Sequence, residues 1–293
     1  MARCLLAFPN LIDGDQGAVT LSGGRWRAAL PLSNLGLPQL AAVARSETAA
    51  PEDTWFQVDL GVTRDVRVLA IPRHTLSPSA KVRVRAGPAP LVGVAPIADI
   101  DTGWSEVWGQ IYPAGTLPWG HPSVWDGRLR MEDTAGYPMP VLVVWEPACL
   151  ARYWRVDIED ASNPAGVIDL SRLVLSPGWQ PSLNLSYGAR LGWDIATTAE
   201  ISLGGARWFD VRPPRRVASF TLEGLPEDEM LSVAFDLQQR LGLHRQLFFV
   251  FDPDDRFHRH RRSFLATLGQ VSRLEFPYFR RVSAGFDIEE VIA

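Results

Sequence analysis

The chain is poor in cysteine and almost without lysine. Cys4 and Cys149 are the only cysteines among 293 residues, so at most one disulfide can form, and no cysteine spacing typical of a metal site exists. This usage favours a reducing compartment, and we expect two free, buried thiols. Lys81 is the only lysine, and arginine supplies every other cationic side chain. Arginine favours buried contacts and interfaces because a guanidinium pairs and stacks better than an ammonium.

Long hydrophobic runs are also missing. The apolar residues near the start of the chain are too few for a signal peptide, and no other stretch is long enough to span a bilayer. Hydrophobic residues make up 46% of the chain, charged residues 21%, and the formal net charge is -4. This composition is typical of a folded protein and does not call for a nucleic-acid partner. We expect a soluble chain that no standard signal exports.

Catalytic signatures are missing as well. The sequence has no Gly-x-Ser-x-Gly elbow, no phosphate-binding Walker loop, no Gly-x-Gly-x-x-Gly after a strand and no His-Glu-x-x-His motif. The acidic pair of a glycoside hydrolase need not be close in sequence, so Glu106, Asp126 and Glu132 stay open as candidates for such a pair. We expect no enzyme, no cofactor and no metal site.

The clearest pattern in the chain is an alternation across residues 54–71. Val58 and Leu60 fall on one side of an extended chain and Trp55, Gln57 and Asp59 on the other, which is the period of a strand. The alternation resumes at residues 64–71 after Gly61. We therefore expect two core strands joined by a tight turn at Gly61, and we expect the first half of the chain to fold around them.

Further strands are expected on both sides of a Pro/Gly-rich boundary at residues 176–181. Pro226 opens a helix at about 226–241, because proline suits the first helical position and the acidic residues after it suit the helix N-terminus. Gly242 ends that helix. The other expected strands lie at 79–85, 141–145, 152–158, 167–175, 206–211, 217–222, 246–251, 263–274 and 283–291. The sequence predicts a mainly β protein with domains at 1–178 and 179–293.

The first half resembles the discoidin-type, galactose-binding-type jelly roll over about residues 20–176. The resemblance is carried by Trp-Phe-Gln-Val-Asp-Leu-Gly at 55–61, by Ala-Ile-Pro-Arg-His at 70–74, and by Arg-Tyr-Trp-Arg-Val-Asp-Ile at 152–158. The strand at 79–85 and the closing segment at 163–175 also fit. The resemblance implies a jelly-roll β-sandwich more firmly than it implies a ligand.

The second half resembles the ring-forming domain of distal tail proteins from long-tailed bacteriophages over about residues 183–293. The resembling features are a strand pair, one helix, the turn at 249–255 and the ending at 278–290. This resemblance implies a smaller β-barrel-like domain with one helix. It also implies assembly as a homo-oligomeric ring through edge strands and loops, with other tail proteins as partners and the virion tail as the location. Assembly would then take place in the host cytoplasm.

Residues 86–140 are irregular and rich in Gly, Pro and Trp, which suggests loops on a β-scaffold. Their aromatic rings can form a platform for a sugar face, since jelly rolls of this type bind ligands through loops at one end. Alternatively, the rings hold the loops against the sandwich or against a neighbouring subunit. The candidate glycan or loop contacts are Arg73, His74, Trp104, Trp108, Trp119 and Trp125, with Tyr112, His121 and Asp101 beside them.

A run of acidic and then basic residues follows the strand at 246–251. The Asp-Pro-Asp-Asp sequence at 252–255 is typical of a tight turn, and it lacks the spacing of a calcium loop. The basic run after it suits a contact with an acidic neighbour, a backbone phosphate of DNA in a tail lumen, or, least of all, a metal. The candidate assembly surface comprises Asp252, Asp254, Asp255, Arg256, His258, Arg259, His260, Arg261 and Arg262.

The resemblance of the second half implies a structural component of a phage tail tip or of a phage-derived particle, in which strand edges and buried Trp and Arg side chains make the contacts. The alternative is a carbohydrate-binding protein that contacts host-surface glycans through the jelly-roll loops. A third interpretation, a glycan-degrading enzyme, has the least support. The first two differ in whether the Trp-bearing loops are covered by a partner or free.

Overall fold

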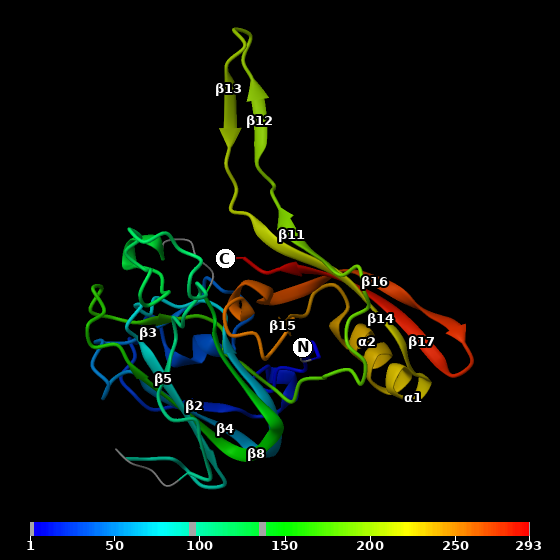
Figure 1. Cartoon of the computed structure of the whole chain (residues 1–293). Helices are drawn as coiled ribbons and strands as arrows, with labels where there is room; N and C mark the ends of the chain where they lie inside the picture. The colour runs from blue at the N-terminus through cyan, green and yellow to red at the C-terminus, as the bar shows by residue number, and fades with distance from the viewer. Residues whose placement is uncertain (1–2, 94–97, 135–138, 293) are drawn as a thin grey trace. The chain divides into compact units, whose positions relative to one another are not determined.

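The computed structural model describes residues 3–93, 98–134 and 139–292. The chain divides into two units, both visible in Figure 1. Unit 1 contains the residues up to Gln180 together with Phe248–Ser263, and unit 2 contains Pro181–Leu247 and Phe264–Ile292. The predicted division at residue 178 placed 248–263 in the second domain, whereas in the structure this segment belongs to unit 1.

Unit 1 is a jelly-roll β-sandwich, and the mainly β class predicted from the sequence is confirmed. Its seven-stranded sheet has the order β10-β4-β8-β5-β6, with β2 also paired to β4 and β7 to β5. A separate two-stranded sheet pairs β3 with β9. The strands are β2 (Thr20–Ser22), β3 (Ala44–Arg45), β4 (Trp55–Ile71), β5 (Lys81–Gly87), β6 (Ile100–Asp101), β7 (Ser105–Glu106), β8 (Val141–Glu159), β9 (Asp169–Leu170) and β10 (Val174–Ser176). The short helical turns are η1 (Gly14–Gln16), η2 (Leu32–Gly36) and η3 (Met131–Asp133).

The expected turn at Gly61 is wrong, because β4 runs through this position as one strand. Gly61 has a φ of 75°, which a residue with a side chain rarely adopts, and the pairing of β4 with β8 is irregular between Asp59 and Arg64. On both sides of this irregularity β4 pairs with the same strand, β8. Gly61 therefore bends a long strand rather than reversing the chain.

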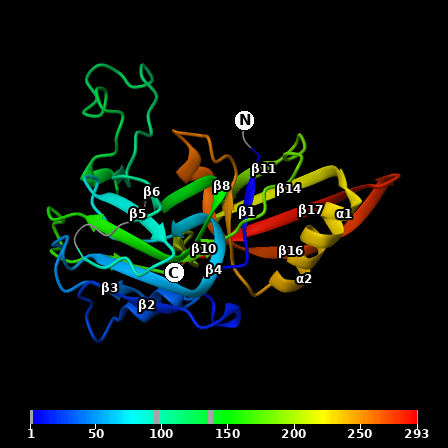
Figure 2. The same cartoon turned by 90° about the horizontal axis from the view of Figure 1, so that it is seen from below.

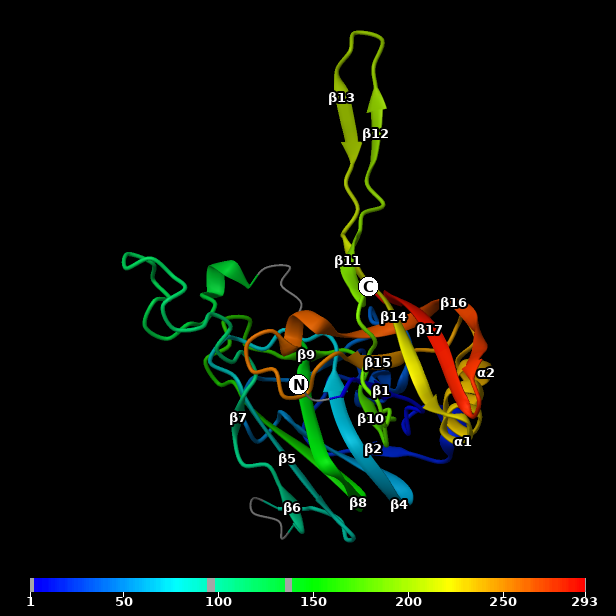
Figure 3. The same ribbon diagram turned by 45° about the vertical axis from the view of Figure 1, so that its right-hand side comes forward.

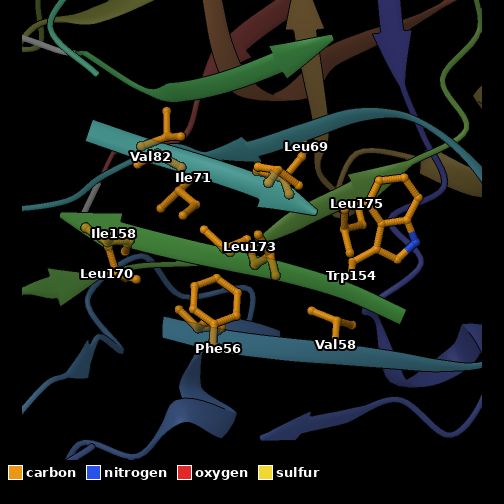
Figure 4. Close-up of a cluster of buried hydrophobic side chains, with 14 of the residues drawn as sticks. Phe56, Val58, Leu69, Ile71, Val82, Trp154, Ile158, Leu170, Leu173 and Leu175 are labelled. Carbon is orange, nitrogen blue, oxygen red and sulfur yellow. The ribbon is translucent and has the colours of Figure 1, made fainter. Parts of the chain in front are cut away.

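The core of unit 1 lies against β4, β8 and β5. Phe56, Val58 and Trp154 are buried there together with Leu170 and Leu173, and Figure 4 shows these side chains gathered on one side of the sheet. Leu170 comes from β9 and Leu35 from η2, so both layers share this core. The alternation in the sequence thus marks the apolar side chains that are buried on folding. Removal of apolar surface from water is the main favourable contribution to the free energy of folding.

The first strand of the chain and a late strand pair with each other. β1 (Leu5–Ala7) is antiparallel to β15 (Leu247–Val250), with Leu6 opposite Phe249. Leu6 also exchanges backbone hydrogen bonds with Trp179, at 2.9 and 2.8 Å. This pairing places the connection after β15, residues 251–262, in unit 1. That connection ends in the short helix η5 (Arg259–Arg262).

Unit 2 is a half-barrel antiparallel sheet with one helical segment, which corresponds to the predicted smaller β-barrel-like domain. Its strands lie in the order β16, β17, β14, β11 (Figure 3). Phe220 and Phe286 stack in its core, with ring centroids 5.5 Å apart. The strands are β11 (Arg190–Asp194), β12 (Thr198–Ile201), β13 (Arg207–Asp210), β14 (Arg215–Pro226), β16 (Ser263–Tyr278) and β17 (Arg281–Glu290).

The helical segment covers residues 227–241, close to the predicted 226–241. It consists of α1 (Glu227–Glu229), the π-helical η4 (Met230–Phe235) and α2 (Asp236–Leu241). Met230, Ala234 and Leu237 are buried, as the predicted apolar face requires. Gly242 follows with a φ of 51° and ends the helix.

Candidate functional site

A long loop of unit 1, residues 107–134, stands out from the sandwich (Figure 2). Trp108 anchors its start: the ring is only 5% exposed, and its Nε1 atom donates a hydrogen bond to Leu76 O at 2.9 Å. Trp108 packs with Ile111 and Leu129 of the loop and with Met139, which follows it, in a small hydrophobic cluster. Trp108 therefore anchors the loop.

His74 is part of the same anchor. Its ring packs edge-on against Trp108 with centroids 6.2 Å apart, and its Nδ1 accepts a hydrogen bond from Leu76 N at 3.1 Å. Burial lowers the pKa of His74 to about 4, so the imidazole is neutral near pH 7. His74 therefore supplies no positive charge to a ligand at this pH.

Ion pairs and backbone hydrogen bonds hold the middle of the loop. Arg128 Nη2 lies 2.6 Å from Glu106 Oε2, which ties the loop to β7, and Arg130 lies 3.3 Å from Asp126. Gly127 N donates to Ser123 O at 2.8 Å. Two of the three carboxylates proposed for glycoside hydrolysis, Glu106 and Asp126, are thus engaged in holding the loop together, while the third, Glu132, is exposed.

Trp119 and Trp125 are the exposed aromatic pair of this loop. Their side chains are 81% and 80% exposed, and their rings meet edge-to-face with centroids 5.3 Å apart. Tyr112 and His121 make a second edge contact nearby in the loop, at 6.2 Å. Of the four tryptophans predicted as glycan or loop contacts, the structure buries Trp108 and presents this pair to solvent.

The remaining predicted contacts are not gathered at the aromatic pair by any described interaction. Trp104 is 45% exposed, and Arg73 is exposed at the end of β4. Asp101 accepts a hydrogen bond from Arg83 Nε at 2.9 Å, and this bond lowers the pKa of Asp101 to about 2. Asp101 is therefore an ionised partner of Arg83.

The predicted assembly run at 252–262 is folded tightly in unit 1. Asp252 and Asp255 accept hydrogen bonds from backbone N–H groups of the turn that follows each of them. Asp255 also forms an ion pair with Arg262, whose guanidinium lies 4.9 Å from the centre of the Phe251 ring. His260 is buried, while Asp254, Arg256 and Arg261 are exposed. The run therefore divides into residues that build the turn and residues that face solvent.

A small cavity lies at the base of the loop that carries Trp119 and Trp125. Its volume is about 100 Å³. The wall consists of Val82, residues 105–107, 109–111 and 139–143, and Arg256, Arg259 and His260. Sequence reasoning missed this cavity, because residues 256–260 reach it only through the pairing of β1 with β15.

A second exposed apolar surface lies in unit 2, on a hairpin that we call the arm (residues 195–211). β12 and β13 form its two strands, with Ala199 opposite Phe209, and they project beyond β11 and β14 in Figure 1. Ile201 and Phe209 lie on one face and are 66% and 60% exposed. The sequence predicted β13 but not this pairing, which Gly204 and Gly205 at the turn signal.

Neither a cluster of metal-ligating side chains nor a membrane-spanning helix is found in the described part of the chain. In residues 3–93, 98–134 and 139–292, no three His, Cys, Asp or Glu side chains are grouped as metal ligands would be. The helices of these same residues lack the length and apolar character that a membrane crossing requires. Cys4 and Cys149 are not joined in a disulfide, and burial raises the pKa of Cys4 to about 12.

No protein-family model matches the chain, and no curated protein matches its sequence. Several solved structures are similar in fold. A fucose-binding module of Streptococcus pneumoniae aligns with a TM-score of 0.35 and 13% identity, over 58% of this chain and 95% of the module. The family 32 carbohydrate-binding module of Clostridium perfringens NanJ, solved with galactose, aligns with a TM-score of 0.34 and 13% identity, over 54% of this chain and 92% of that module.

The lectin binding domain of Lectinolysin, solved with Lewis b, is similar to the same degree. Its TM-score is 0.34 and its identity 12%, over 58% of this chain and 97% of that domain. Similarities of this size assign neither a family nor a ligand. The comparisons give no support to the predicted role in a phage tail, which stays a prediction.

Proposed function

We propose that unit 1 is a glycan-binding module that holds a sugar against Trp119 and Trp125. The observation that carries the proposal is the exposure of this ring pair, 81% and 80%, on a loop with its own hydrophobic anchor. Large aromatic side chains that are exposed together mark an interaction site more often than scattered ones do. The apolar C–H face of a pyranose is a ligand surface that such rings cover well.

The anchoring of the loop favours a small ligand. Trp108, Glu106 and Arg128 fix both sides of the loop before any ligand arrives, so little conformational entropy is lost on binding. Edge-to-face packing of Trp119 on Trp125 also holds the two rings at a set angle of 89°. A preformed surface of this kind is typical of carbohydrate recognition by loops at one end of a sandwich.

The proposal is tested by screening the purified full chain on a glycan array and measuring dissociation constants for the glycans that bind. We expect the double variant Trp119→Ala, Trp125→Ala to bind about 10- to 100-fold more weakly, because the two aromatic contacts each contribute on the order of 1 kcal/mol. Trp208→Ala, which removes an exposed tryptophan of unit 2, is the matched control and should leave the dissociation constant unchanged. An array without hits, or equal binding by the double variant, would show the proposal to be wrong.

A second candidate function, assembly with further copies of this chain, is favoured by the arm of unit 2. A two-stranded hairpin with no core of its own is marginally stable in water, and this one leaves Ile201 and Phe209 uncovered. A second copy offers a suitable cover. Phe276, Tyr278 and Phe279 are 58%, 71% and 89% exposed at the turn between β16 and β17.

The register of β14 with β17 places these two surfaces at opposite ends of unit 2. Val217 pairs with Glu289 near the arm, whereas Pro226 pairs with Arg281 near the β16–β17 turn. One chain therefore cannot cover its own arm with its own turn, and a head-to-tail contact between copies covers both. Such a heterologous contact closes into a ring or extends as a filament.

Light scattering of the full chain across a concentration series tests this second function. We expect oligomers that the variant Ile201→Ser, Phe209→Ser converts to monomers. Val62→Ser removes an exposed valine of unit 1 and should leave the mass unchanged. A wild-type monomer at all concentrations would contradict self-assembly and would leave the tail-ring prediction without a structural basis in this chain.

A further inference from the structure

The cavity at the base of the loop is lined by two arginines that have no carboxylate partner among the described residues. Arg259 is half-buried, and its Nη2 atom lies 3.5 Å from Leu142 O, at the outer limit of a hydrogen bond. Arg256 lines the same cavity and is exposed. In the part of the chain that the structure describes, neither guanidinium forms an ion pair with Asp or Glu.

Arg259 differs in this respect from the arginines buried in the fold. Each of those has a carboxylate partner: Arg85 and Arg155 pair with Asp157 at 2.7 and 2.9 Å, Arg172 pairs with Asp13 at 2.7 Å, and Arg216 pairs with Glu290. A guanidinium that leaves water without a negative partner is destabilising. Burial accordingly lowers the pKa of Arg259, and no neighbouring carboxylate opposes that shift.

The carboxylate that does line the cavity is already neutralised. Glu106 Oε2 lies 2.6 Å from Arg128 Nη2, so its charge is offset by the loop. Ser105, also in the wall, donates its hydroxyl to Val82 O at 3.1 Å. The uncompensated charge at the cavity is therefore positive and comes from Arg256 and Arg259.

The size of the cavity suits a small polar group. Its volume of about 100 Å³ is ample for several water molecules, each of which needs roughly 10–15 Å³ of such volume. That space admits a carboxylate or a sulfate group. Because Arg259 presents several N–H donors in a plane, it suits the oxygens of such an oxyanion.

We propose that this cavity binds the oxyanion of an acidic sugar, a carboxylate or a sulfate, with Arg259 as its main partner and Arg256 as a second cation. The assignment rests on the proposed glycan-binding function in one respect, namely that a sugar carries the oxyanion. It deepens that function by naming an acidic glycan as the ligand class. The cavity adjoins residues 107–111, the start of the loop that presents Trp119 and Trp125.

The test measures dissociation constants of the full chain for glucuronate, galactose 6-sulfate, glucose and galactose by isothermal titration calorimetry. We expect at least one acidic sugar to bind about tenfold or more tightly than its neutral counterpart, in line with charge-assisted hydrogen bonds. Arg259→Gln should abolish this difference, and Arg27→Gln, which removes an exposed arginine elsewhere in unit 1, should preserve it. A preference for glucuronate identifies a carboxylate, and a preference for the sulfate ester identifies a sulfate.

Equal affinity for acidic and neutral sugars, or an unchanged preference in Arg259→Gln, would overturn the inference. If Arg259→Gln fails to fold, Arg256→Gln should weaken acidic-sugar binding about threefold, and raising the salt concentration should weaken it in the wild type but spare neutral sugars. The absence of both effects would likewise overturn it.

The two proposals fail in different ways. Binding of neutral glycans through Trp119 and Trp125, without a gain from an acidic group, leaves the glycan-binding function standing and overturns the cavity assignment. Binding of acidic sugars that depends on Arg259 but not on the two tryptophans supports the cavity and removes the aromatic pair from the site. If no sugar binds at all, both proposals are wrong.

Discussion

The loop of unit 1 and the arm of unit 2 both expose aromatic side chains, but they are built differently. The loop has a hydrophobic cluster around Trp108 and internal ion pairs such as Glu106–Arg128. The described contacts of the arm are the pairing of β12 with β13, backbone turns at its end and exposed ion pairs such as Arg212–Asp210. The loop is therefore organised before it meets a ligand, whereas the arm lacks a core of its own.

This difference separates two uses of an exposed aromatic residue. A ring on an anchored loop can bind a small molecule, since binding needs no further ordering. A ring on a bare hairpin gains most from a large partner surface that completes a core around it. The exposed fraction of a tryptophan does not distinguish these cases, because Trp125 and Trp208 are 80% and 70% exposed. The anchoring of the segment does.

The largest effect is expected from removing the anchor of the loop. Trp108→Ala deletes the hydrogen bond to Leu76 O and leaves a cavity among Ile111, Leu129 and Met139. We expect the free energy of unfolding to fall by about 3–5 kcal/mol. Urea unfolding followed by circular dichroism measures this change. A loss below about 1 kcal/mol would mean that the loop is no better anchored than the arm.

A similar loss is expected at the base of the arm. Arg216 pairs with Glu290 and lies 4.9 Å above the Phe264 ring. Arg216→Met leaves the largely buried Glu290 carboxylate without its ion-pair partner and with only the backbone N–H of residue 216 as a described donor, and we expect a loss of about 3 kcal/mol in the free energy of unfolding. The matched variant Arg259→Met removes an arginine without a carboxylate partner and should cost less than about 1 kcal/mol. Equal losses in the two variants would contradict the contrast drawn between these arginines.

A smaller, pH-dependent effect is expected from the Arg83–Asp101 pair, on the strands that lead to the loop. The bond from Arg83 lowers the pKa of Asp101 from 3.8 to about 2, so its contribution is present at neutral pH and is lost as the pH falls through about 2. The pair is partly exposed, which limits this contribution to about 1 kcal/mol or less. Arg83→Gln should therefore be less stable than the wild type in urea at pH 6 and equally stable below about pH 2. A difference that persists at the lowest pH would have another cause.

The smallest effect on stability is expected at the aromatic pair itself. Trp119→Ala with Trp125→Ala removes two rings that are mostly in water, so the free energy of unfolding should change by less than about 0.5 kcal/mol. Thermal unfolding monitored by circular dichroism measures this. A marked destabilisation would show that these rings support the loop, which would favour the packing interpretation over the glycan platform.

Much of the fold could be predicted from the sequence, because it depends on local patterns. The alternation in residues 55–71 marks a buried strand, and the spacing of Met230, Ala234, Leu237 and Leu241 marks a helix face. The Gly61 turn was predicted wrongly because glycine permits both a reversal and a bulge. Only pairing with β8 on both sides of Gly61 distinguishes the two.

The candidate site could be predicted only in part. The richness of residues 86–140 in tryptophan indicated a functional or packed loop, but burial of Trp108 and exposure of Trp119 depend on which ring finds neighbours in the folded chain. The basic run at 256–262 was visible as charge alone. In the structure Arg262 pairs with Asp255, whereas Arg259 has no described carboxylate partner. This difference depends on the turn that brings residue 255 back to residue 262.

By itself, the sequence determined the mainly β class, the helix at 227–241 and the segments that hold the exposed rings, since periodicity and turn chemistry act over a few residues. Tertiary structure alone decided that the segment after β15 belongs to unit 1. That placement follows from the pairing of Leu5 with Val250, two residues at nearly opposite ends of the chain. Long-range pairing of this kind leaves no local signature, because its free energy comes from surfaces that meet only after the chain has folded.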